Sequence, residues 1–531
     1  MHLLSGVSAG SQMKEASSMQ PGSTRMPAWE KGILPPPPAW GWKNWAIMLG
    51  PGLLSAGAAI GGGEWLMGPV NTARYGGAIL WVTTVSILAQ VIYNIEISRY
   101  TLYTGEPIMI GKFRTLPGPL FWLGLYMLLD AGSLIPYQAS NCATPVVAIF
   151  RGDVPTPKTV PADKALVLGI GCIIYVVTVI PLLFSGKIYS FVKGLMAVKI
   201  VVVFTCLTFL ALLYSSAATW GDIVSGFFKF GTVPVESGGL DNIFLSFFRG
   251  EGMPAVDPKA FAALAAYAAI AGVGGLKNSV ISNYTRDQGW GMGAHVGAIP
   301  SIFRRRNLQL SHVGMVFEVN DESLPRWKSW VRHVRREQLA IWMTGALVGV
   351  ALPAMLSVQF LPRGTVGDNW AMAAMTAGGV REYVGGLLGG IYWYVLMVCA
   401  ILVLVPNTVA DADGTVRRWV DLAWTGVKRL RRWDLPRVNR LYFWTMAGYV
   451  LIGVLILLFL SQPKGLVEIY GCIANFALGF SCWHVLIVNL TLLPRQLRPG
   501  WFGRVSIFLA GAYFLSLSII TLAFELNKLR G

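Results

Sequence analysis

Long runs of apolar residues, separated by short polar connections, dominate the pattern of this chain. A helix that crosses a bilayer needs roughly 20 predominantly apolar residues, and the chain supplies about eleven runs of that length. The runs lie near residues 44–68, 76–103, 117–150, 164–184, 191–215, 258–284, 338–360, 385–408, 440–461, 467–493 and 503–525. The pattern therefore predicts an all-α polytopic membrane protein.

Composition supports this class. Hydrophobic residues make up 54% of the chain and charged residues 13%, and the mean hydropathy is +0.56. The net charge of +17 would also fit a nucleic-acid-binding protein, but the basic residues concentrate in alternate connections between the apolar runs. Because cytoplasmic loops of membrane proteins carry an excess of lysine and arginine, this distribution is an orientation signal. It predicts a multi-pass protein of the cytoplasmic (inner) membrane, surrounded by lipid, with its amino terminus inside and no nucleic-acid partner.

Two glycine clusters, each followed by an ionisable residue, interrupt two of the apolar runs. Unwound backbone inside a bilayer is tolerated only where it is buried in protein or lines a polar cavity. Two such breaks in corresponding positions of two halves are typical of secondary transporters with inverted repeats, and they indicate the substrate site. The residues expected to line this site are Gly61, Gly62, Gly63, Glu64, Gly274, Gly275 and Lys277.

The apolar runs divide into two groups of five that run in opposite directions across the membrane if the amino terminus is inside. Residues 44–215 would form the first inverted repeat, and residues 258–494 the second, which includes a cytoplasmic loop at 285–337. Residues 216–257 would form an extracytoplasmic loop, and 495–531 an additional eleventh helix with a tail. The first 43 residues are polar and proline-rich, and we expect a disordered cytoplasmic tail.

Three motifs resemble the first two helices of the Nramp divalent-metal transporters. They are Gly-Pro-Gly-Leu-Leu-Ser-Ala at 50–56, Asn-Thr-Ala-Arg-Tyr-Gly-Gly-Ala-Ile-Leu-Trp-Val at 71–82, and Thr-Gly-Glu at 104–106. The resemblance implies a LeuT-type fold, with a five-plus-five inverted repeat and broken helices 1 and 6. It also implies a secondary transporter that works by alternating access.

The two metal-binding motifs of that family are missing here. Its Asp-Pro-Gly-Asn motif in helix 1 falls on positions 61–64, where this chain has Gly-Gly-Gly-Glu, and its Met-Pro-His motif in helix 6 falls on Gly275, Leu276 and Lys277. Thioether and imidazole ligands suit transition metals, whereas carboxylate, carbonyl and water suit hard cations. We therefore expect Glu64 to bind a hard divalent cation such as magnesium, or manganese, rather than iron.

Lys277 opposes a metal site, because a second positive charge close to a dication is repulsive. A charged residue in the bilayer tends to find a partner, so a Glu64–Lys277 pair is an alternative that would suit an organic solute such as an amino acid or amine. A nontransporting scaffold locked by that pair is a further alternative.

Coupling residues are expected in two other helices. Lys199 lies inside an apolar run, where a lysine in other LeuT-type transporters takes the place of a sodium ion; otherwise it extends its ammonium group to the membrane surface. Asp130, without a sequence partner, is a candidate proton relay. Asp411 and Asp413 would line the inner vestibule or form a solvated helix end.

Other chemistry finds little support. The chain has no His-Glu-x-x-His motif, no Gly-x-Ser-x-Gly elbow and no Walker loop, which argues against an enzyme and against a bound cofactor. A membrane enzyme remains a remote alternative. The six cysteines stand singly without metal-binding spacing and are expected to be buried thiols. His484 is expected to be a hydrogen-bonded packing residue rather than a ligand.

Overall fold

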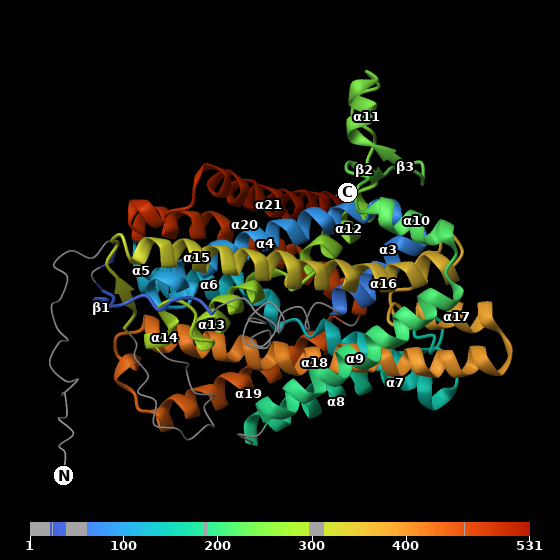
Figure 1. The fold of residues 1–531 in the computed structure, drawn as a ribbon. Helices are drawn as coiled ribbons and strands as arrows, with labels where there is room; N and C mark the ends of the chain where they lie inside the picture. The colour runs from blue at the N-terminus through green and yellow to red at the C-terminus, as the bar shows by residue number, and fades with distance from the viewer. Residues whose placement is uncertain are drawn as a thin grey trace, which may run out of the picture.

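A bundle of long helices forms the body of the protein in a computed structural model (Figure 1). The structure describes residues 22–23, 25–38, 61–184, 188–296, 313–460 and 462–530. The first part of the expected first helix, residues 44–60, and the motif at 50–56 lie outside the described residues.

The helical elements follow in chain order. In the first half they are η2 (Gly63–Met67), α3 (Gly68–Tyr75), η3 (Gly77–Ile79), α4 (Trp81–Thr104), α5 (Ile108–Arg114), α6 (Pro119–Leu129), η4 (Ala131–Leu134), α7 (Tyr137–Arg151), α8 (Pro161–Phe184), α9 (Ile188–Tyr214), α10 (Ala217–Gly226) and α11 (Ile243–Phe248). In the second half they are α12 (Pro258–Ile270), η5 (Gly275–Ser279), α13 (Val280–Asp287), α14 (Gly293–Val296), α15 (Ser323–Glu337), η6 (Gln338–Met343), α16 (Thr344–Phe360), α17 (Met375–Val384), α18 (Gly386–Gly426), η7 (Leu430–Arg432), α19 (Leu435–Phe459), α20 (Pro463–Leu492), η8 (Arg495–Leu497) and α21 (Trp501–Arg530).

Among the described residues, 8 helices are long and apolar enough to cross a membrane, and up to 9 if one bent pair counts as a single span. Most lie within a few residues of the expected segments. The chain is therefore an all-α, multi-pass membrane protein.

Three differences from the expected helix boundaries have physical reasons. The run at 117–150 is two helical segments, Pro119–Leu129 and Ala131–Arg151, bent by 49°, because the backbone of Asp130 (φ −90°, ψ 4°) between them leaves the α-helical geometry. The helix expected from 338 begins at Ser323, inside the expected loop, and α18 continues past the expected end to Gly426. Both extensions carry charged residues, but each also buries apolar side chains: Trp327 and Trp330 on α15, and Val416 and Val420 on α18.

The expectation of a disordered amino-terminal tail is wrong for residues 25–38. Strand β1 (Glu30–Gly32) pairs in parallel with β4 (Met315–Phe317), and Trp29 and Leu34 are buried. The polar and proline-rich composition concealed the few apolar side chains that fix this segment against the bundle.

The two sequence breaks have distinct geometry. A π-helical turn, η2, leads into α3, whereas α12 ends at Ile270 and the chain resumes as η5 after an interruption. Gly272, Gly274 and Gly275 have φ values of 89°, 71° and 56°, a region that costs other residues about 1–2 kcal/mol. The described part of the chain thus contains the break expected in helix 6.

Candidate functional site

Glu64 joins the two breaks. Its Oε2 accepts a hydrogen bond from the backbone N–H of Gly61 at 2.9 Å, and its Oε1 accepts one from the N–H of Gly272 at 2.7 Å. The side chain is fully buried. Close packing accompanies these bonds, since a Cβ added to Gly63 would lie 2.6 Å from the carbonyl oxygen of Ile270. The carboxylate therefore satisfies backbone donors that unwinding has freed on both sides.

Gln90 on α4 holds the second break from the other side, and the sequence analysis missed it. Its Oε1 accepts from the N–H of Gly274 at 3.2 Å and from Nδ2 of Asn278 at 2.9 Å. Its Nε2 donates to the carbonyl of Ala271 at 2.7 Å. The available signal was the recurrence of polar residues every four positions in an apolar run, at Ser86, Gln90 and Asn94, because buried polar groups in a bilayer need partners.

Lys277 pairs with Asp411 rather than with Glu64, so the expected Glu64–Lys277 pair is wrong. The Nζ atom lies 2.6 Å from Oδ2 of Asp411, which also accepts from Nε2 of Gln138 at 2.7 Å. The ammonium group lies 4.8 Å from the centre of the Tyr470 ring and so gains cation–π stabilisation. Asp411 comes from the middle of α18, where its position inside a helix gave no indication of this partner.

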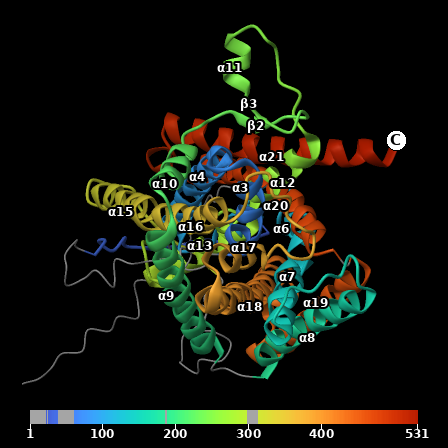
Figure 2. The same ribbon diagram turned by 90° about the vertical axis from the view of Figure 1, so that its right-hand side faces the viewer.

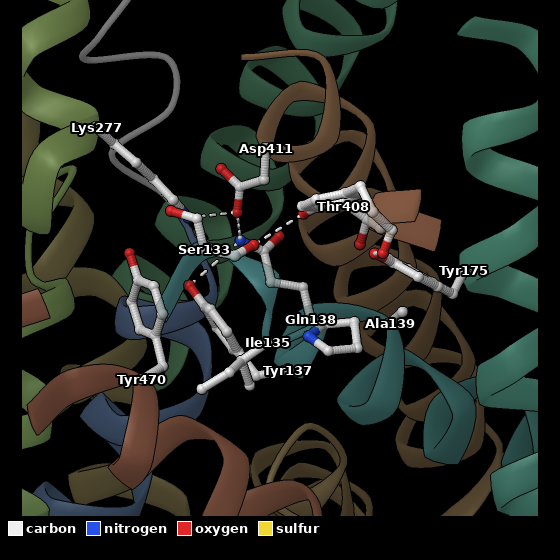
Figure 3. Close-up of a pocket in the computed structure, with 12 residues that line it drawn as sticks. Ser133, Ile135, Tyr137, Gln138, Ala139, Tyr175, Lys277, Thr408, Asp411 and Tyr470 are labelled. Carbon is white, nitrogen blue, oxygen red and sulfur yellow. Dashed lines mark hydrogen bonds and ion pairs between the residues drawn. The ribbon is translucent and has the colours of Figure 1, made fainter. Parts of the chain in front are cut away.

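A small cavity beside this pair has a volume of about 10 Å³, which is room for about one water molecule. Figure 3 shows that α7, α18 and α20 contribute side chains to it, around the contact between Lys277 and Asp411. Its lining mixes hydroxyl groups, an amide, aromatic faces and one ion pair. The residues are Ser133, Ile135, Pro136, Tyr137, Gln138, Ala139, Tyr175, Lys277, Thr408, Asp411, Tyr449 and Tyr470.

Lys199 on α9 is buried within the bundle and does not extend to the membrane surface. Its Nζ donates to Oδ1 of Asn407 on α18 at 2.9 Å. The charges of Glu64 and Asp411 lie close enough to act on it. Lys199 thus interacts electrostatically with charged residues near the breaks, although it does not line the cavity.

Asp130 has a partner that the sequence did not reveal. Its Oδ2 lies 2.5 Å from Nη2 of Arg418 and accepts from Nε1 of Trp419 at 2.7 Å, while Oδ1 accepts from the hydroxyl of Ser133 at 2.8 Å. Since Ser133 also lines the cavity, one hydrogen bond separates Asp130 from the cavity wall.

One ion pair lies beside the second break, between Lys277 and Asp411. Glu64 is held instead by backbone N–H groups, and Lys199 donates to Asn407. Within the part of the chain that the structure describes, no three His, Cys, Asp or Glu side chains lie together in a way that could hold a metal ion.

Glu96 is buried and pairs with Arg99 on the same helix at 2.8 Å. His484 forms hydrogen bonds of 2.8 Å with the hydroxyls of Thr115 and Tyr126.

Comparison with known proteins identifies the fold. The sequence matches no model of a protein family, and it matches no curated protein. The structure resembles that of a single-site mutant of the manganese transporter of Eremococcus coleocola, with a TM-score of 0.60 and 13% identity, over 94% of this chain and 91% of that one. The same transporter in complex with an aromatic bis-isothiourea compound gives a TM-score of 0.61 at 13% identity, over 97% and 92% of the two chains. The chain thus has a LeuT-type transporter fold, as expected, and the proteins it resembles are transporters rather than enzymes.

Proposed function

We propose that this protein is an Nramp-related secondary active transporter that moves a small zwitterionic organic solute by alternating access. The expected amino-terminus-inside orientation in the inner membrane is part of this proposal. The observation that carries it is the Lys277–Asp411 pair on the wall of the cavity beside the broken helix.

An ion pair at this place suits a ligand that carries both charges. A solute with a carboxylate and an ammonium group can replace each partner, because its carboxylate would bind Lys277 and its ammonium would bind Asp411. The ring of Tyr470, which now faces the lysine ammonium, would then lie near the exchanged charges. Such a replacement leaves no buried charge unpaired, which is the condition that a low-dielectric site imposes.

A hard divalent cation, the substrate expected from the sequence, is the second candidate. Its support is the similarity of the fold to a structure described as a manganese transporter, together with the carboxylates of Glu64 and Asp411. Against it, Glu64 already accepts two backbone hydrogen bonds and Asp411 is neutralised by Lys277. A dication would also meet repulsion from Lys277.

The coupling proposal rests on Lys199. Its ammonium donates to Asn407 and lies within electrostatic range of Glu64 and Asp411, so loss or gain of its proton would change the charge near the breaks. We retain Asp130 as a candidate relay through Ser133. We predict that Lys199→Met removes the dependence of solute uptake on a proton gradient, measured in proteoliposomes at fixed solute concentration.

The test of the substrate class is thermal stabilisation of the purified protein by a panel of magnesium, manganese, calcium, amino acids and polyamines. A ligand that binds only the folded state raises apparent stability by mass action. We expect a saturable shift with an amino acid that Lys277→Met abolishes and Lys259→Met retains; Lys259 is an exposed residue of the same helix region. A saturable shift with a divalent metal alone would overturn the organic-solute proposal.

A further inference from the structure

The segment between α10 and α12, residues 227–257, forms an arm that stands apart from the bundle. It contains a two-stranded antiparallel sheet, in which β2 (Thr232–Pro234) pairs with β3 (Leu240–Asn242), followed by the short helix α11. Figures 1 and 2 both show α11 beyond the outline of the bundle, on the side that α21 forms. The arm therefore extends sideways from the body.

The orientation of α11 relative to the spanning helices decides how it lies against the membrane. Figure 1 shows α11 nearly perpendicular to the long helices that cross the bilayer. Its axis consequently lies nearly parallel to the membrane plane. A helix in that orientation beside a bundle lies over lipid, as interfacial helices do.

The base of the arm is fixed to the bundle. Nε1 of Trp81, at the start of α4, donates to the carbonyl of Thr232 at 2.7 Å, and the hydroxyl of Thr84 donates to the carbonyl of Phe227 at 2.9 Å. Trp81 also packs against a small buried cluster that includes Leu517 of α21. The outward faces of α21, such as Ile519 and Leu522, are exposed and apolar, so the base of the arm adjoins a surface that faces lipid.

The outer part of the arm exposes large apolar side chains, of which Phe247 and Phe248 contact each other with ring centres 5.8 Å apart. Phe248 is 82% exposed and Met253 is 73% exposed. Four further exposed residues belong to the same group: Phe228, Phe244, Leu245 and Phe247. The helix has little polar surface, since the hydroxyl of Ser246 turns inward to Oδ2 of Asp241 at 3.1 Å. So many large exposed apolar side chains on one short segment mark an interaction site.

We propose that this arm docks on the lipid bilayer beside the bundle and inserts its aromatic side chains into the membrane interface. Three observations favour lipid over a second copy of the chain: the lateral direction of the arm, the orientation of α11 parallel to the membrane, and the continuity of its base with the lipid-facing side of α21. Aromatic residues concentrate at the membrane–water interface for the same physical reason. The inference is independent of the transported solute.

The test places an environment-sensitive fluorophore on the arm. In a background without the six native cysteines, Phe248→Cys is labelled with a nitrobenzoxadiazole dye and reconstituted into nanodiscs that contain nitroxide-labelled phosphatidylcholine. The matched control is Ser237→Cys, an exposed polar position in the turn between β2 and β3. Because both positions are exposed, neither change removes a core contact, and Met253→Cys provides a second label if the first variant folds poorly.

We expect lipid nitroxides to quench the label at position 248 several-fold more than the label at position 237. Equal quenching at the two positions, or no quenching at 248, would overturn the proposal. Absence of quenching together with disulfide-linked dimers of Phe248→Cys would assign the arm to a contact between two copies instead.

Discussion

Replacement of Glu64 gives the most direct view of how the two breaks are held together. In Glu64→Ala the N–H groups of Gly61 and Gly272 lose their acceptor. A buried donor left without a partner costs about 1–3 kcal/mol, so the substitution should lower the free energy of unfolding by roughly 2–6 kcal/mol. Glu64→Gln keeps one acceptor oxygen and should cost about half as much.

Thermal unfolding in detergent measures this effect as a shift of the apparent melting temperature. With an unfolding entropy of about 2.1 cal/mol/K per residue over the whole chain, the alanine variant should melt about 2–5 °C lower and the glutamine variant about 1–3 °C lower. Glu382→Ala, at an exposed position of α17, is the control and should not change the melting temperature. If Glu64→Ala had the same melting temperature as Glu382→Ala, the hydrogen bonds of Glu64 would not stabilise the breaks.

Two further substitutions test other parts of the structure. Gly274→Ala should lower the melting temperature, because its φ of 71° disfavours a side chain and the new Cβ would lie 2.1 Å from the carbonyl oxygen of Ala269. The control Gly239→Ala, at a position with no neighbouring atom closer than 4.0 Å, should have little effect. Equal melting temperatures of the two variants would contradict the described break. Asp222 lies on α10, outside the spanning helices: burial raises its pKa, but hydrogen bonds from Gly77 and Arg363 outweigh burial and lower the pKa below 3.8. The contribution of Asp222 to stability should be complete above about pH 4 and disappear as pH falls through the lowered pKa. Between pH 6 and pH 3, the melting temperature of the native protein should therefore fall by more than that of Asp222→Asn. An equal fall in the two proteins would refute this interpretation.

The break expected in helix 6 could be predicted from the sequence because its signals are local. Glycines at Gly61–Gly63 and Gly272–Gly275 weaken a helix wherever it packs, and a charged residue next to each cluster is visible without any structure. These signals were sufficient to expect broken helices around a polar region. The fold followed from the same segments together with the resemblance at 71–82.

The partners of the charged residues could not be predicted, because they come from distant parts of the chain. Lys277 and Asp411 are separated by 134 positions, and Glu64 meets Gly272 across 208. Opposite charges at comparable membrane depth suggested Glu64 and Lys277 as partners, but the freed N–H groups of the breaks were equally available to a carboxylate. The choice depends on helix packing, which a single sequence does not specify.

The start of the helix at Ser323 and the end of α18 at Gly426 could not be predicted for a related reason. The expected helix ends fell where charged residues begin, although a helix that leaves the membrane can continue with one packed face and one solvated face. Trp330 on α15 and Arg418 on α18 illustrate this continuation: the tryptophan is buried, and the arginine reaches back to Asp130.

The central claim is that the Lys277–Asp411 pair forms part of a site for a zwitterionic solute, and uptake into proteoliposomes tests it most directly. The measurement compares uptake of radiolabelled amino acids and of manganese by the native protein, Lys277→Met, Asp411→Asn and Lys259→Met. The account predicts saturable uptake of an amino acid by the native protein and by Lys259→Met, loss of that uptake in the other two variants, and no uptake of manganese. Uptake of manganese without uptake of any amino acid, unchanged in Lys277→Met, would contradict it.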